Sequence, residues 1–511
     1  MTSTRRSPTS VGRFCLVLHT HLPWLAHHGS WPVGEEWLYQ AWSSSYLPVV
    51  DLLNALAAEG HTDVLTLGLT PVLAAQLDNP HCLNEEQTWL GFWAARALGM
   101  ASDPDRGVRE AGAREHLAAQ RAIESFDLRW SRGGSAALRP LADAGVIELL
   151  SGPATHPFQP LLHERVAALS LRVGLDDSRM RLGTSPAGIW APECGYRPGL
   201  ERIYSEQGVS HVVVDGPTMR HVGGSTSAAH TLGDTDVAVF ARDLDITYRV
   251  WSPRRGYPGG AWYRDFYAMD VVNGFRRSRV TTTSTPSHQK APYEPERASI
   301  AAEADARDFV AHVRAHLLDI RDQRGGRAGL VVAAYDTELF GHWWHEGPQW
   351  LGHVLRMLPE AGVEVSTLQG ALDSGAVEGR VDLESGSWGS GKDWRVWEGN
   401  AVADLVAEND SLQGRLLDMV DKAHDGGDGR RDPALDQLVR SALLALSSDW
   451  AFMVTKDTAA HYARQRHLGH HADFHRLADL IASGRGPQAE RVAHAQRTVD
   501  GPFAHLDARL L

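Results

Sequence analysis

The sequence predicts an α/β protein built on a parallel sheet, either open or closed into a barrel. Short runs that are apolar on both faces alternate with helical patterns over the first two thirds of the chain. Such strands belong to parallel sheets whose two faces are covered by helices. Polar residues also follow several of these strands directly, and parallel folds place their chemistry at those carboxyl ends.

The predicted elements begin with a strand at 14–18, which ends in the sequence HTHLPW, and continue with a helix near 46–59. Residues 80–140 are mostly helical and interrupt the alternation, which indicates an inserted helical subdomain. The remaining predicted strands are 63–69, 146–150, 189–190, 211–214, 237–240 and 330–334.

Two later segments break this alternation. Residues 253–297 are rich in Gly, Pro, Ser, Thr, Arg and Tyr and show little periodicity, which is typical of a functional lid or a disordered loop. Residues 400–480 are strongly helical. A chain of 511 residues exceeds one compact core. We expect a barrel domain formed by 12–79 and 141–380, a helical subdomain at 80–140 and a C-terminal helical domain at 381–511.

Composition and net charge limit the kinds of molecule that we expect the protein to bind. The net charge of -13 argues against a nucleic-acid backbone. The three cysteines are far apart and suggest no disulfide framework, and no Cys/His metal cluster is present in the sequence. The apolar run at 14–18 is too short for a signal segment or a membrane span, so we expect a cytoplasmic protein without a membrane partner. Seventeen Trp against twelve Phe suit either sugar binding or core packing.

Glu193 is the first candidate for chemistry. It lies in Trp-Ala-Pro-Glu-Cys-Gly-Tyr, between an apolar strand and a glycine-containing turn. A partly desolvated carboxylate on a rigid element suits a nucleophile or an acid/base. The alternative is a solvent-exposed glutamate at a turn or helix start.

Asp336 is the second candidate, because it ends the strand 330–334 and precedes a run of aromatic residues and histidines. Burial would raise its pKa and keep it protonated, as a general acid requires. The alternative is an N-cap of the next helix. Glu338 and Glu346 are rival carboxylates. Two carboxylates at different strand ends are the minimum for glycoside chemistry, although sequence does not give their separation.

The pair His19 and His21 leaves a second chemistry open. An HxH motif after a first barrel strand is also typical of metal-dependent hydrolases, and His156 and Asp336 could complete a ligand set. The density of Trp around these residues argues against this alternative, because second shells of metal sites favour carboxylates and amides.

Three segments together, HTHLPW, WAPECGY and AAYDTELFGHWWHEGP, resemble glycoside hydrolase family 57 and, within it, the branching enzymes. The resemblance extends over essentially the whole chain, with the segments in the family's order. It implies an incomplete (β/α)7 barrel with an inserted helical subdomain and a C-terminal all-α domain. It also implies that Glu193 is the nucleophile and Asp336 the general acid/base.

The resemblance further implies a set of glucan contacts and no cofactor or metal. Tyr257 or the nearby Tyr263 is a candidate gate for the acceptor, and the run VIELL supplies Glu148 as the acidic member of a second family segment. The expected substrate contacts are His19, His21, His156, Trp251, Tyr257, Arg264, Gly274, Trp388, Trp397 and Asp449.

The reaction implied by the resemblance is a retaining double displacement on α-1,4-glucan. Transfer to a 6-hydroxyl makes an α-1,6 branch. Water as acceptor would make the protein an α-amylase, and a 4-hydroxyl would make it a 4-α-glucanotransferase. The metal-dependent hydrolase is a distant alternative, and a non-catalytic glucan-binding protein is disfavoured by the two carboxylates.

Overall fold

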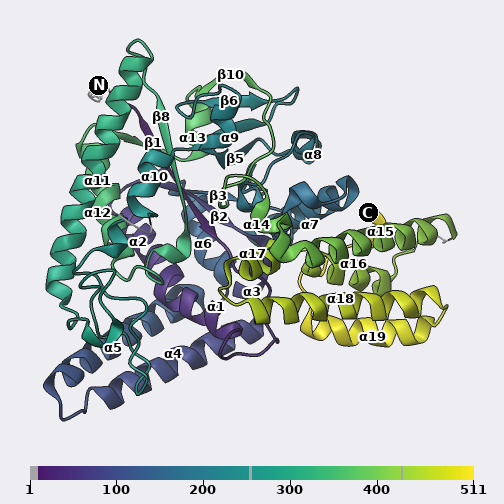
Figure 1. Ribbon diagram of the computed structural model, residues 1–511, viewed down its shortest axis with the longest axis horizontal. Coiled ribbons are helices and arrows are strands. Elements are labelled where there is room, and N and C mark those ends of the chain that lie inside the picture. Colours follow the sequence, from purple (N-terminus) through teal and green to yellow (C-terminus); the bar gives the residue numbers. More distant parts are fainter. Residues whose placement is uncertain (1–9, 253–255, 427–429) are drawn as a thin grey trace.

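The computed structural model describes residues 10–252, 256–426 and 430–511. Figure 1 shows central strands surrounded by helices, with a helical hairpin on one side and a group of helices that ends in the C-terminus on the other. Within the described ranges, no helix combines the length and apolar character needed to cross a bilayer.

Seven parallel strands of the described chain form the barrel. Two hydrogen-bonded groups, β3-β2-β1-β8 and β7-β5-β4, supply them. The groups are joined at one seam by the Ser151–Ile189 bridge, and at the other by a hydrogen bond of 2.7 Å from the Asp243 amide to the Val332 carbonyl. The strands are β1 (Arg13–Thr20), β2 (Leu65–Leu69), β3 (Ile147–Leu150), β4 (Gly188–Ile189), β5 (His211–Asp215), β7 (Ala238–Arg242) and β8 (Leu330–Asp336).

This ring confirms the predicted (β/α)7 class and every strand that the sequence predicts. Three further strands were not predicted, because each is short and lies outside the ring. β6 (Ala229–Leu232) pairs antiparallel with the start of β7, and β10 (Val377–Val381) adds to β6. β9 (Glu364–Val365) pairs with the first residues of β1.

The side chains of each strand point alternately into two hydrophobic cores, one inside the ring and one outside it. Cys15 and Val17 of β1 pack inside the ring with Val213, Phe240 and Val332. The intervening residues, such as Leu16 and Leu18, pack outward in the core shared with the surrounding helices. Apolar side chains are therefore needed on both faces, which explains the continuous apolar runs.

Helices cover the outside of the barrel and connect each strand to the next. The helices are α2 (Leu47–Ala58), α3 (Pro71–Leu77), α6 (Gly134–Asp143), α7 (Glu164–Leu182), α8 (Leu200–Glu206), α9 (Gly216–His221), α10 (Leu244–Val250), α11 (Pro295–Gln323), α12 (Gly347–Glu360) and α13 (Leu368–Asp373). The helix predicted near 46–59 corresponds to α2. α1 (Glu35–Ala41) and a π-helical turn at Trp42–Tyr46 precede it.

The two long helices α4 (Pro80–Met100) and α5 (Arg106–Ser125) form the hairpin at the lower left of Figure 1. The segment predicted as a loop, 253–297, begins in three residues outside the described ranges. From 256 to 294 it contains only short 3₁₀ turns and crosses towards the hairpin, where Phe275 packs with Ala97, Met100 and Ala111.

The C-terminal helices lie at the right of Figure 1. One short helix in this region, α17, begins at the barrel: the Pro157–Ser447 bridge joins its start to the loop after β3. This contact brings residues from the end of the chain to the mouth of the barrel. The helices are α14 (Arg395–Glu398), α15 (Ala403–Gly426), α16 (Pro433–Ala445), α17 (Ser448–Lys456), α18 (Ala460–Ala482) and α19 (Gly486–Val499).

Candidate active site

Glu193 lies in a tight turn directly after β4. The 3₁₀ turn Pro192–Cys194 places Glu193 at φ 61° and Cys194 at φ 50°, in the left-handed region that non-glycine residues rarely adopt. Backbone hydrogen bonds at 2.9 Å and 2.8 Å, donated by Cys194 and Gly195, close the turn. A conformation of this kind costs about 1–3 kcal/mol and persists only where its surroundings fix it.

Two donors from distant parts of the chain hold the Glu193 carboxylate. The Trp388 indole Nε1 donates to Oε2 at 2.8 Å, and the Ser448 hydroxyl donates to Oε1 at 2.9 Å. The Trp388 amide also donates to the Glu193 carbonyl at 2.9 Å. The side chain is therefore fixed between a strand end, the loop 386–392 and α17.

The pKa of Glu193 is raised to about 7, because burial disfavours its charge more than the hydrogen bonds from Trp388 and Ser448 favour it. Glu193 is 8% exposed, so one small part of it reaches the mouth of the barrel. A carboxylate that is ionised at neutral pH and above, on a rigid turn, is suited to nucleophilic attack.

Asp336 ends β8 beside His19, its partner in the β1–β8 register. Within the described ranges its carboxyl makes no hydrogen bond, and it is partly exposed. Burial and the charges of Glu338 and Glu193 raise its pKa well above the usual range. The raised pKa favours the protonated form that a general acid requires, and the contribution of the Glu193 charge shows that the two carboxyls interact.

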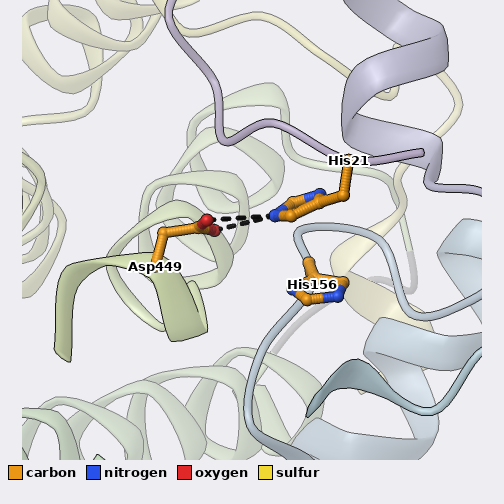
Figure 2. A group of neighbouring side chains, drawn as sticks. All are labelled: His21, His156 and Asp449. Carbon is orange, nitrogen blue, oxygen red and sulfur yellow. Dashed lines mark hydrogen bonds and ion pairs between the residues drawn. The ribbon is translucent and has the colours of Figure 1, made fainter. Parts of the chain in front are cut away.

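Three histidines line the same mouth. His19 and His156 share a hydrogen bond of 3.1 Å between their Nε2 atoms, and the His21 ring stacks on His156 with centroids 3.7 Å apart. Figure 2 shows His21 directed at Asp449, whose two oxygens lie 3.1 Å and 3.0 Å from His21 Nε2. The Ser448 hydroxyl, 3.0 Å from His156 Nδ1, connects this group to Glu193.

The pKa values of the three histidines are shifted in different directions. Although burial opposes its charge, the Asp449 carboxylate raises the pKa of His21. Burial and the neighbouring imidazoles lower the pKa values of His19 and His156 far below the usual range. The mouth therefore combines an imidazole whose charged form is favoured by Asp449 with two imidazoles whose neutral forms are favoured.

One trio of this group could also hold a metal ion. Ligand atoms of His21, His156 and Asp449 lie within 4.8 Å of one another. Asp449 uses both oxygens on His21 in this arrangement, so a metal would have to displace an existing ion pair. The trio includes Asp449 and lacks His19 and Asp336. It therefore differs from the ligand set considered from the sequence, which was His19, His21, His156 and Asp336.

The rival carboxylates are held by other groups. Glu338 is buried, accepts a hydrogen bond from the Tyr46 hydroxyl, and its pKa is raised to about 7 by burial. Glu346 accepts the Arg264 amide at 3.1 Å. Glu148 points into the barrel, where it pairs with His211 at 2.7 Å and accepts from Thr66 at 2.8 Å.

A buried charge group lies beside Trp388. Asp215, with 0% exposure at the end of β5, pairs with Arg242 at 2.7 Å and with Lys392 at 2.8 Å. The Arg242 guanidinium lies 5.2 Å from the centre of a Trp388 ring, and the Lys392 ammonium donates to the Trp388 carbonyl at 3.1 Å. Trp190 packs edge-on against the same indole at 5.0 Å. Trp388 is thus fixed in the position from which it donates to Glu193.

The structure brings seven of the predicted residues together at the mouth: Glu193, Asp336, His19, His21, His156, Trp388 and Asp449. Other predicted contacts lie in different surroundings. Trp397 is 2% exposed and stacks on Phe158 at 4.5 Å. Arg264 pairs with Glu115 of α5 at 2.8 Å, and Gly274 adopts φ 76° near Arg96.

The aromatic residues of the predicted lid also have defined places. The Tyr257 ring packs against Phe309 and Trp350, and its hydroxyl donates to Asp308. Tyr263, the other gate considered, is buried with its hydroxyl bonded to Asp305. Trp251 and Trp343 instead form an exposed edge-to-face pair, 36% and 38% accessible, with ring centres 5.5 Å apart.

Sequence reasoning missed Ser448, Arg242, Asp215 and Lys392. Ser448 adjoins Asp449, which the family resemblance gives as an expected substrate contact, so its neighbour was the available signal. Asp215 directly follows the predicted strand 211–214 and Arg242 lies two residues after the predicted strand 237–240, and opposite charges after two such strands indicate a buried pair. No local signal marks Lys392.

Comparison with known proteins agrees with this geometry. The chain matches the family described as Glycosyl hydrolase family 57 over residues 15–383, and "1,4-alpha-glucan branching enzyme, C-terminal" over 410–511. It is 51% identical to a probable 1,4-alpha-glucan branching enzyme of Mycobacterium tuberculosis, over 100% of this chain and 99% of that protein.

Two archaeal proteins are also similar. A 1,4-alpha-glucan branching enzyme of Thermococcus kodakarensis is 32% identical, over 92% of this chain and 74% of its own length. The crystal structure of a GH57-type branching enzyme from Pyrococcus horikoshii superposes with a TM-score of 0.91 at 30% identity, covering 98% of this chain and 96% of that one. The chain therefore belongs to glycosyl hydrolase family 57.

Proposed function

We propose that this protein is a retaining 1,4-α-glucan branching enzyme, with Glu193 as nucleophile and Asp336 as general acid/base. The observation that carries the proposal is that the mouth of the barrel holds two carboxyls with raised pKa values: Glu193 after β4, with a pKa of about 7, and Asp336 at the end of β8, where the charge of Glu193 contributes to the shift. The match of residues 410–511 to the branching-enzyme C-terminal family, and the names of the relatives, support the choice of acceptor.

In the first step Asp336 gives its proton to the leaving oxygen of an α-1,4 bond while a Glu193 oxygen attacks the anomeric carbon. The bond between that carbon and the leaving oxygen breaks, and the shortened glucan departs as an alcohol. Trp388 and Ser448 orient the attacking carboxylate. The product is a glucosyl ester on Glu193.

In the second step Asp336, now ionised, removes the proton from an acceptor hydroxyl, which attacks the anomeric carbon and releases Glu193. Two inversions give net retention. A 6-hydroxyl as acceptor makes an α-1,6 branch. His19, His21 and His156 line the mouth beside the two carboxyls and are the side chains that would contact the sugar at this point.

The alternative within the same chemistry is α-amylase or 4-α-glucanotransferase activity. The test uses purified protein with amylose and follows iodine colour, reducing ends and α-1,6 linkages together. We expect colour to fall without a matching rise in reducing ends, while α-1,6 linkages appear. Reducing ends that rise in step with colour loss would establish hydrolysis, and chain-length redistribution without α-1,6 linkages would establish 4-α-transfer.

The metal-dependent alternative rests on the trio of His21, His156 and Asp449. Because the proposed double displacement needs no metal, incubation with a strong chelator followed by gel filtration should leave the rate on amylose unchanged. Loss of activity that Zn²⁺ restores would instead establish a metal-dependent enzyme.

The proposal also includes a glycogen-like substrate and a cytoplasmic location. The three buried free thiols support a reducing compartment.

A further inference from the structure

A second pocket lies between α5 and the segment that follows Arg264. Its volume is about 140 Å³. None of the side chains around Glu193 and Asp336 lines it, and Glu115 is the only acid among its lining residues, all of which are described. The lining consists of Ala111, Arg114, Glu115, Ala118, Arg264, Arg276, Arg277, Tyr293, Pro295 and His345.

The charges in this pocket do not balance. Arg264 is neutralised by Glu115 at 2.8 Å, and Arg277 is paired with Asp270. In the described chain, neither Arg114 nor Arg276 forms an ion pair. Two guanidinium groups, the exposed Arg114 and the partly buried Arg276, therefore line one pocket without a carboxylate of their own, and an anion in the pocket would gain both as partners.

Arg276 is held in place by contacts that leave part of its guanidinium free. Its Nε donates to the Phe266 carbonyl at 2.5 Å, and the group lies 4.5 Å from the centre of the Phe266 ring. Burial and the nearby Arg264 lower the pKa of Arg276. Burial, Arg264 and Arg276 also lower the pKa of His345 to about 3, so this imidazole is neutral.

We propose that this pocket binds the phosphate group of a small ligand, with Arg114 and Arg276 as its principal partners. The planar guanidinium group matches two phosphate oxygens at once. Two unpaired guanidinium charges also match the charge of about -1.5 to -2 that a phosphate monoester carries at neutral pH. The phosphate comes either as the free ion or as part of a sugar phosphate.

The place of the pocket gives such binding a structural effect. Arg114 belongs to α5 of the hairpin, whereas Arg276 belongs to the segment 256–294 that crosses to it (Figure 1). A phosphate that bonds to both would tie the segment to the hairpin. Bound ligand should therefore protect both elements together from amide exchange.

The test titrates the full-length protein with inorganic phosphate and, separately, with glucose 6-phosphate by calorimetry, at constant ionic strength set with chloride. Arg276→Gln and Arg114→Gln should each weaken binding tenfold or more. The matched control is Arg121→Gln, an exposed arginine further along α5 that does not line the pocket. Hydrogen exchange should show protection in 106–120 and 264–277.

The two ligands distinguish the source of the phosphate. Tighter binding of glucose 6-phosphate than of inorganic phosphate would support a sugar phosphate, and the reverse would support the free ion. Absence of binding by both ligands would overturn the proposal. Binding that persists in Arg114→Gln and in Arg276→Gln would place the anion elsewhere and would overturn it as well; Arg114 is exposed, so its variant is expected to fold.

Discussion

Asp336 and Glu193 divide the work of the proposed reaction by their protonation, and a pair of variants separates the two roles. Asp336→Asn should slow the reaction on amylose by roughly 10²–10⁴-fold, because the leaving oxygen no longer receives a proton. The loss should be much smaller on α-glucosyl fluoride, whose leaving group needs no proton. Glu193→Gln should lose activity on both substrates. Equal losses of the two variants on the fluoride would contradict this assignment.

Ser448 should control the acidic side of the pH profile. Activity requires ionised Glu193 and protonated Asp336, so kcat/KM rises through the pKa of Glu193, about 7, and falls above that of Asp336. Ser448→Ala removes a donor that stabilises the ionised form. The acidic limb should therefore move to higher pH by about one unit.

The check is a pH–rate series on amylose for the wild type, Ser448→Ala and a control, Ser374→Ala, whose side chain is exposed. The basic limb should stay in place, since Ser448 is bonded to Glu193 and His156 rather than to Asp336. An acidic limb that does not move, or that moves to lower pH, would show that Ser448 does not stabilise the nucleophile.

Trp251 forms half of the exposed pair with Trp343, and we expect it to act as a platform for a glucose ring. Stacking of this kind contributes about 1 kcal/mol, so Trp251→Ala should raise KM for amylose about fivefold with little change in kcat. Phe92→Ala is the control, because Phe92 is a 65% exposed aromatic side chain on α4 of the hairpin. A fall in kcat at constant KM would place Trp251 in the chemical step instead.

At the scale of elements, the strands β5 and β7 and the loop 386–392 meet in the charge group of Asp215, Arg242 and Lys392. Arg242→Met leaves Asp215 buried with Lys392 alone, which should destabilise the fold by about 3 kcal/mol. Urea unfolding followed by fluorescence measures this. The exposed pair made by Arg380 gives a control, and Arg380→Met should leave the midpoint nearly unchanged.

Because Trp388 packs on Arg242 and donates to Glu193, the same variant should lower kcat on amylose even where the protein remains folded. Arg242→Lys keeps a charge but loses the planar group, so it should recover more stability than activity. Full activity in Arg242→Met would show that the indole holds its place without this contact.

The strand ends show what the sequence could predict. All seven barrel strands were predicted because both of their faces are apolar, and Glu193 and Asp336 were found because they follow such strands. The strand pattern left open whether the sheet closes, and only the family resemblance implied a barrel, since the two seams rest on one bridge and one hydrogen bond between residues far apart in sequence. The partners of Glu193 were only partly foreseen, because Ser448 and Trp388 reach it through tertiary packing alone. The domain boundaries stay a prediction.

At the scale of the whole molecule, the site draws on both ends of the chain. His19 lies in the first strand and His21 directly after it, whereas Ser448 and Asp449 come from α17 in the C-terminal helices. The barrel alone therefore supplies both carboxyls but not the group that bonds to Glu193 Oε1 or the counter-ion of His21.

This arrangement has a consequence for synthesis on the ribosome. Glu193 and Ser448 are separated by 255 residues. At about 5–20 residues per second, Glu193 is made roughly 10–50 s before the hydroxyl that holds it. The left-handed turn exists without either side-chain donor until Trp388 is made, 195 residues after Glu193, and with Trp388 alone until Ser448 follows, so the nascent barrel carries a nucleophile that is present but not yet held in place. The carboxylate of Glu193 should therefore reach its final position only after Ser448 has been made and α17 has packed against the barrel.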